Sequence, residues 1–173
     1  MNSQYLHYFL LTQILLFGWL QVPAQTRFFQ GSFPPKEIGK LSQTLADSSL
    51  DIQGNLEEGT LILDSLAYTM VYRRGKNFLV DESKQIHAVV YRKQFEVQGQ
   101  RYKVKGNQLV LLSDSSLMVG QAFVSRKNRT YYVGISSSTD LPDLVVGIFF
   151  YKLLLRLQPQ DPYLMNMAFP HTY

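Results

Sequence analysis

The strongest hydrophobic pattern in this chain is residues 141–157, LPDLVVGIFFYKLLLRL, in which apolar residues fall on every side of an expected helix. Pro142 suits the first helical turn, and Asp143 complements the positive end of the helix dipole. Pro159 and Pro162 stop the helix beyond its C-terminus. Because a helix that is apolar all round must be buried all round, the pattern predicts a helix at the centre of the fold.

A membrane-spanning helix is the alternative interpretation of the same residues. About sixteen helical residues are short for a bilayer, which needs about twenty. A spanning helix would also carry Lys152 and Arg156 inside its apolar stretch. We therefore favour a buried core helix whose charged C-terminal end emerges into solvent.

Residues 60–135 alternate apolar and polar side chains with a period of two. The alternation is clearest in AYTMVYR at 67–73, and glycine-containing turns follow at 74–77, 98–100 and 105–107. This spacing predicts roughly eight or nine short strands in an antiparallel meander. Closing the meander removes exposed sheet edges, so we predict a mainly β fold, a small barrel that closes around or against the hydrophobic C-terminal helix.

The chain begins with a hydrophobic segment. Residues 1–24 contain no Asp, Glu, Lys or Arg, and Val22 and Ala24 occupy the small-residue positions of a cleavage site. We predict a secretory signal peptide at 1–24, with Gln25 as the first mature residue, and hence a secreted or periplasmic protein. An uncleaved membrane anchor is the alternative, because about 18 residues from Tyr5 to Val22 just suffice to cross a bilayer.

Residues 25–59 have no sustained period. We predict an irregular lead-in there, with a short helix over residues 36–45 that places Ile38, Leu41 and Leu45 on one face. Residues 47–59 are polar and rich in turn formers, as a linker would be. The predicted organisation is a signal peptide (1–24), a lead-in (25–59), a barrel domain with its helix (60–158) and a C-terminal tail (159–173).

Composition narrows the class of protein. The chain is 46% hydrophobic and 17% charged, which is typical of a globular domain. Eleven Tyr and eleven Phe favour a β-rich fold. The absence of cysteine excludes disulfides, thiolate metal sites and a cysteine nucleophile, so packing alone must stabilise the fold.

Candidate catalytic groups are few. His87 is the only histidine of the predicted globular body, and no Ser or Asp neighbour can be assigned to it. The closest carboxylate pairs are Asp81 with Glu82 and Asp140 with Asp143, which turn solvation and helix capping explain. No two histidines have metal-ligand spacing. We therefore predict a non-enzymatic protein with no catalytic residue, no metal and no cofactor.

Basic residues recur at the predicted turns and strand ends. If they gather at one rim of the barrel, they form a positive face for an anionic membrane or envelope surface. The candidate contact residues are Arg73, Arg74, Lys76, Arg92, Lys93, Arg126, Lys127 and Arg129, and a wider set adds Arg101, Lys103 and Lys105. Ordinary solvation of turns explains the same residues, and the sequence taken alone favours this interpretation. The net charge of +4 is mild, and aromatic and basic residues do not interleave as a stacking platform requires, so we expect no nucleic acid.

Two segments resemble the tubby C-terminal-like superfamily, which includes tubby, the phospholipid scramblases and the LURP-one-related proteins. They are YTMVYRRGKNFLVDESKQIHAVVYRK at 68–93 and TYYVGISSSTDLPDLVVGIFFYKLLL at 130–155. They look like the strand-turn-strand pattern of that family and its final strand, loop and core helix. The resemblance implies a closed antiparallel barrel that encloses a central C-terminal helix. It also implies association with phosphoinositides or membranes through basic residues, and it fixes no individual lipid-binding residue.

Together these observations predict a binding or structural role for a barrel domain at an anionic membrane or envelope surface, with no protein partner indicated. The first alternative is a lipocalin-like carrier with a hollow barrel and an outer helix, but such a helix should be amphipathic and residues 144–151 are not. A hydrolase of envelope polymers is a third hypothesis that lacks a nucleophile. Enclosure of Ile148 and Phe149 by strands favours the first hypothesis, and a hollow barrel beside them favours the carrier.

Overall fold

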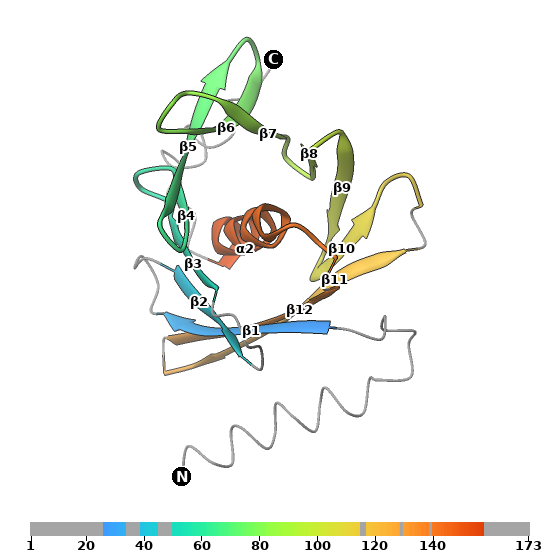
Figure 1. The fold of residues 1–173 in the computed structure, drawn as a ribbon. Coiled ribbons are helices and arrows are strands. Elements are labelled where there is room, and N and C mark those ends of the chain that lie inside the picture. The colour runs from blue at the N-terminus through green and yellow to red at the C-terminus, as the bar shows by residue number, and fades with distance from the viewer. Residues whose placement is uncertain are drawn as a thin grey trace.

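The chain folds into a closed antiparallel β-barrel with a helix along its interior (Figure 1). The computed structural model describes residues 26–33, 39–44, 50–114, 117–128, 130–138 and 140–157. These residues form the helix α2 (Asp143–Leu157) and twelve strands. The strands are β1 (Thr26–Phe33), β2 (Gly39–Thr44), β3 (Asp51–Asn55), β4 (Thr60–Leu63), β5 (Leu66–Arg73), β6 (Lys76–Asp81), β7 (Ile86–Val90), β8 (Gln94–Val97), β9 (Gln100–Lys105), β10 (Gln108–Leu111), β11 (Met118–Lys127) and β12 (Thr130–Ser138).

The barrel is a simple meander. Each strand pairs with the next one along the chain, and β1 pairs with β12 over its whole length, from Thr26 opposite Ser138 to Phe33 opposite Tyr131. This last pairing leaves no open sheet edge at the junction of first and last strands. The predictions of a mainly β fold and a closed barrel around the C-terminal helix are confirmed, and β4–β12 supply the nine strands expected after Thr60.

The interior of the barrel is filled by α2. Its residues from Val145 to Leu154 are all buried, and Ile148 and Phe149 are each 1% exposed. Inward side chains of the strands alternate with outward ones, as in β12, where Tyr131, Val133 and Ile135 are buried. Figure 1 shows α2 surrounded by strands, with β3 and β4 closest to it. The predicted enclosure of the helix is therefore confirmed.

The predicted lead-in at 25–59 is wrong, because β1, β2 and β3 lie there. The short helix predicted over 36–45 is wrong where the structure describes it, since Gly39–Thr44 is β2; residues 36–38 and 45 lie outside the described residues. The linker predicted at 47–59 contains β3. Pairing with neighbouring strands decides these conformations, because the sequences of these strands show no sustained alternation of their own.

Two glycines explain why this part of the sequence looks irregular. Gly39 and Gly54 are paired between β2 and β3, and a Cβ on either would lie 2.4 or 2.5 Å from a methyl carbon of Leu154. They make room for a large core side chain of α2. A glycine that leaves room for a neighbouring side chain in a strand cannot be distinguished, from the sequence, from a glycine in a turn.

A third glycine gives a prediction about stability. A Cβ on Gly31 in β1 would lie 1.9 Å from the backbone oxygen of Lys40 in β2, so Gly31→Ala forces the two backbones apart. We expect the free energy of unfolding to fall by about 3 kcal/mol, the upper range for overpacking. Gly134→Ala is the matched control, because its Cβ would meet nothing closer than 3.9 Å. Urea unfolding measures both, and equal midpoints would contradict the packing of β1 on β2.

Candidate functional site

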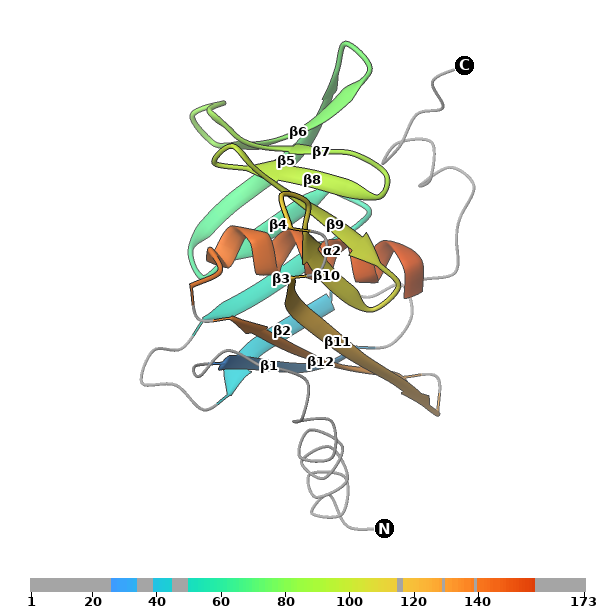
Figure 2. The same ribbon diagram turned by 90° about the vertical axis from the view of Figure 1, so that its right-hand side faces the viewer.

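The two ends of the barrel differ in the turns they carry. Alternate turns of a meander lie at the same end, so the turns β4–β5, β6–β7 and β8–β9 lie where α2 begins. The turns β5–β6, β7–β8, β9–β10 and β11–β12 lie where α2 finishes. Figure 2 shows α2 running across the view between these two sets of turns.

The candidate contact residues lie at one of these ends. All those within the described residues occupy the turns where α2 finishes, or the strand ends beside them, and all are exposed: Arg73, Arg74, Lys76, Arg92, Lys93, Arg126 and Lys127. Arg129 lies outside the described residues. Lys40, Lys105 and Arg156 lie at the same end. We call this set of cations the basic end.

The opposite end, where α2 begins, is mostly acidic. Its described acidic residues are Asp51, Asp64, Asp81, Glu82, Asp114, Asp140 and Asp143, and we call them the acidic end. Its cations are partly neutralised, since Arg27 pairs with Asp143 and Arg101 with Glu96 at 3.0 Å. Arg101 belongs to the wider set of candidate contact residues. It lies opposite Glu96 in the β8–β9 pairing, away from the basic end.

The positive charge of the basic end is not neutralised locally. None of the ion pairs between described residues involves a cation of the basic end, and the only described acidic residues nearby are Glu57 and Glu58 in the β3–β4 turn. The negative end of the α2 dipole lies at this end too, but at about half an elementary charge it offsets only a small part of the positive charge. The barrel is thus polarised along its axis, positive where α2 finishes and negative where it begins.

Two cations of α2 hold turns of the basic end in place. The Nζ of Lys152 donates a hydrogen bond to the backbone oxygen of Tyr91 at 2.5 Å, beside Arg92 in the β7–β8 turn. The guanidinium of Arg156 donates to the backbone oxygen of Gly106 at 2.6 Å in the β9–β10 turn. We had predicted that the charged end of the helix emerges into solvent; Arg156 does, but Lys152 is only 8% exposed. Lys152 is buried because the barrel wall extends past its position on α2.

Burial of Lys152 predicts a pH dependence of stability. Burial lowers the pKa of Lys152 to about 8 from an ordinary value of 10.5. The folded state therefore loses this proton before the unfolded state does, so stability rises with pH between about 8 and 10.5. We expect the parent to gain about 2 kcal/mol relative to Lys152→Met between pH 7 and 10. Burial raises the pKa of Tyr151 to about 12, which lowers stability near pH 10, but both proteins carry Tyr151 and its contribution cancels in their difference.

Chemical unfolding of both proteins at several pH values measures this difference. If the stability of the parent and that of Lys152→Met change in parallel with pH, burial does not lower the pKa of Lys152. Lys105→Met, at an exposed position of the same end, is the matched control and should follow the parent.

His87 belongs to a turn cluster at the acidic end. Its Nε2 lies 2.8 Å from Oδ2 of Asp81, while Oδ1 of Asp81 accepts hydrogen bonds from Oγ of Ser83 at 2.7 Å and from the backbone NH of Gln85 at 2.9 Å. The bond to His87, and then that from Ser83, lower the pKa of Asp81 to about 2. The edge of the Tyr68 ring packs against the imidazole, with centroids 5.3 Å apart.

This cluster does not have the arrangement of a nucleophile and its base. The hydroxyl of Ser83 donates to Asp81 and not to His87, so His87 has no hydroxyl to activate there. The contacts instead hold the β6–β7 turn. The pairing of His87 with Asp81 is not predictable from the sequence, because it accompanies a register shift in the β6–β7 pairing between Leu79 and Val80.

Asp143 forms an ion pair with Arg27 rather than a carboxylate pair with Asp140. Its Oδ1 accepts a hydrogen bond from the guanidinium of Arg27, which also donates to the backbone oxygen of Leu141. These bonds fasten the start of α2 to β1. Asp140 is exposed in the preceding turn.

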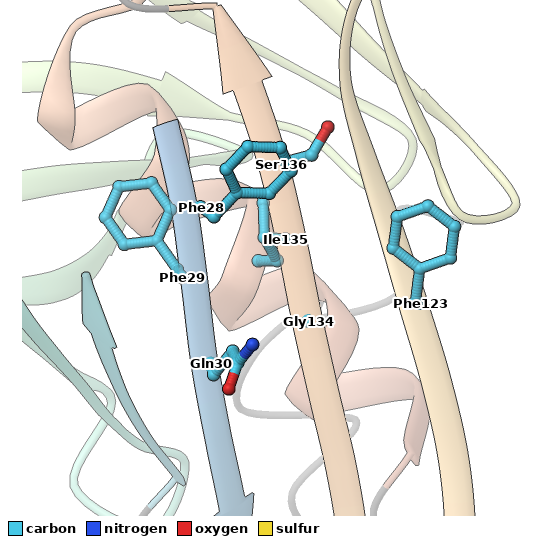
Figure 3. A pocket seen from close by; sticks show the side chains of 7 residues that line it. All are labelled: Phe28, Phe29, Gln30, Phe123, Gly134, Ile135 and Ser136. Atoms are coloured by element: carbon cyan, nitrogen blue, oxygen red, sulfur yellow. The ribbon is translucent and has the colours of Figure 1, made fainter. Parts of the chain in front are cut away.

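A shallow hollow lies on the outer wall of the barrel. Figure 3 shows it over β1, β12 and β11, where Gly134 leaves space between Phe28 and Phe123. The lining is almost wholly apolar and has no titratable side chain. It therefore offers no groups for chemistry.

Within the described residues, three or more metal-ligating side chains do not come together anywhere. No helix in the described part of the chain combines the length and the apolar character needed to span a bilayer. The predicted signal peptide and the tail at 159–173 lie outside the described residues. Comparisons with protein-family models, with curated proteins and with solved structures found no match.

Proposed function

We propose that this chain is a secreted or periplasmic, non-enzymatic barrel domain that binds an anionic membrane or envelope surface through its basic end. The observation that carries this proposal is the placement of the described candidate cations at one end of the barrel, without ion pairs among the described residues. Turn solvation alone gives no reason for the cations to alternate with acidic turns along the meander.

The expected strength follows from surface electrostatics. A Lys or Arg near an anionic bilayer contributes about 1 kcal/mol, and the attraction decays within a Debye length of about 10 Å. Several turns of the basic end can face a flat surface together, whereas the acidic end is repelled. The proposed binding therefore fixes an orientation, with the axis of α2 pointing its C-terminus at the surface.

The position of β1 connects this orientation with the signal peptide. Thr26, opposite Ser138, lies at the acidic end of the barrel. An anchor that ends near Val22 would hold the acidic end at its bilayer and turn the basic end away. We therefore propose removal of residues 1–24, which frees the domain to meet a surface with its basic end.

We also propose that the chain is related to the tubby C-terminal-like superfamily. The enclosed C-terminal helix supports this, since enclosure is the architecture that the resemblance implies. The lipocalin-like carrier requires an open space along the barrel axis, and α2 occupies the axis, with Val145 to Leu154 buried. The hydrolase hypothesis gains no support from the His87 cluster, in which Ser83 is bonded to Asp81.

Vesicle flotation tests the proposed function. We expect recovery with vesicles that contain phosphatidylglycerol to exceed recovery with pure phosphatidylcholine. The excess should decline as the ionic strength is raised about tenfold, from roughly 0.05 to 0.5 M. Equal recovery with neutral vesicles at all salt concentrations would sink the proposal.

A further inference from the structure

One hairpin projects beyond the rest of the basic end. The pairing of β4 with β5 stops at Thr60 opposite Thr69, but β5 continues with β6 as far as Arg73 opposite Lys76. Arg74 and Gly75 form a two-residue turn with positive φ angles of 49° and 77°. Figure 2 shows the β5–β6 hairpin rising away from the neighbouring turns.

The tip of this hairpin combines an exposed aromatic ring with cations. Tyr72 is 45% exposed, and the other exposed large apolar residues within the described part of the chain, Leu66, Ile86 and Leu117, lie at the acidic end. Arg73, Arg74 and Lys76 follow Tyr72 in the sequence and are all exposed. Residues 66–80 contain no acidic residue.

The wall beneath the tip is apolar on its outer face. Val71 is opposite Phe78, and Phe78 is opposite Val89, so three half-buried apolar side chains lie side by side across β5, β6 and β7. A soluble polyanion would use the cations and leave in water Tyr72 and this apolar surface, which lie on opposite faces of β5. A bilayer uses both, because phosphate headgroups pair with cations while tyrosine favours the interface just below them.

We propose that the β5–β6 hairpin is a membrane anchor, which seats Tyr72 in the headgroup layer of an anionic bilayer while Arg73, Arg74 and Lys76 contact lipid phosphates. This inference rests on the proposed function and narrows it from any anionic surface to a lipid membrane. It also assigns membrane insertion to one element of the basic end, while the other turns face the headgroups and add electrostatic attraction.

A single tryptophan reports the position of the hairpin. The only tryptophan in the sequence, Trp19, lies in the segment 1–24 that we propose is removed, so Tyr72→Trp in a chain of residues 25–173 places the sole tryptophan at the tip. Leu66→Trp in the same background is the matched control, because Leu66 lies on the same strand at the acidic end and is 61% exposed. Vesicles are phosphatidylcholine with phosphatidylglycerol, or phosphatidylcholine alone, each with and without brominated acyl chains.

We expect the tryptophan at position 72 to shift to shorter wavelength and to be quenched by brominated lipid only when phosphatidylglycerol is present. The tryptophan at position 66 should change in neither respect. Alanine at Arg73 or Arg74 should lower the vesicle partition constant about fivefold each, without changing the melting temperature.

The outcomes separate this inference from the proposed function. If the chain floats preferentially with phosphatidylglycerol vesicles but position 72 is neither shifted nor quenched, the hairpin is not the anchor and the proposed function stands. If flotation shows no preference for phosphatidylglycerol, both are overturned. Displacement from vesicles by soluble heparin, together with an unquenched position 72, would assign the basic end to a soluble polyanion instead.

Discussion

A chain that carries Phe150→Asp is expected to be unfolded under conditions in which the parent is folded. Phe150 is 0% exposed at the centre of α2, and its ring meets Phe33 of β1 edge-on at a centroid distance of 6.1 Å. Truncation of such a side chain to alanine alone costs about 3–5 kcal/mol. A buried carboxylate without a partner adds several kcal/mol more, which together approach the whole stability of a typical domain, about 5–15 kcal/mol.

Circular dichroism and limited proteolysis measure this outcome. Leu66→Asp also replaces an apolar side chain by a carboxylate, but at a position that is 61% exposed. We expect it to leave the fold intact. A folded Phe150→Asp protein with parent-like stability would mean that α2 is not the core of the barrel. The carrier hypothesis, with α2 packed outside, would then regain support.

How much of the fold is predictable from the sequence depends on how each segment buries its apolar residues. The helix is readable because residues 144–151 are apolar in every direction, which only a central position satisfies. The strands after Thr60 are readable because long alternation and glycine turns occur together. In β2 and β3 the inner face holds Leu41 and Ile52 beside glycines that accommodate Leu154, so no local period distinguishes them from a helix or a linker.

The basic end is partly predictable for a similar reason. In a meander, basic turns that alternate with non-basic turns must share one end. The β5–β6, β7–β8 and β11–β12 turns do so. What the sequence lacks is the exact strand order and length, so Arg101 could not be separated from its neighbours Lys103 and Lys105. The burial of Lys152 was missed because the depth of a helix in its barrel depends on the surrounding wall.

Reversal of two charges at the basic end should remove binding to anionic vesicles. Arg92→Glu with Lys93→Glu replaces two attractive contacts by two repulsive ones, a change of four charges that at about 1 kcal/mol per charge corresponds to a loss of roughly a thousandfold at low salt. Both side chains are exposed in the β7–β8 turn, so the fold should persist. Vesicle cosedimentation gives the partition constants.

Lys84→Glu with Arg101→Glu is the matched control, since it changes the net charge by the same amount at the opposite end. The fifteen residues of α2 span about 22 Å, beyond the Debye length of about 10 Å, so we expect a much smaller loss. Equal losses in the two variants would mean that net charge, not the basic end, governs binding.

The orientation of the barrel on a membrane shows directly whether the basic end is the end that binds. The chain has no cysteine, so Ser125→Cys at the basic end and Ser65→Cys at the acidic end can each carry one polarity-sensitive fluorescent label. With phosphatidylglycerol vesicles, we predict that the label at position 125 enters a less polar environment and that the label at position 65 stays in water. A shift at position 65 with none at position 125 would contradict binding through the basic end.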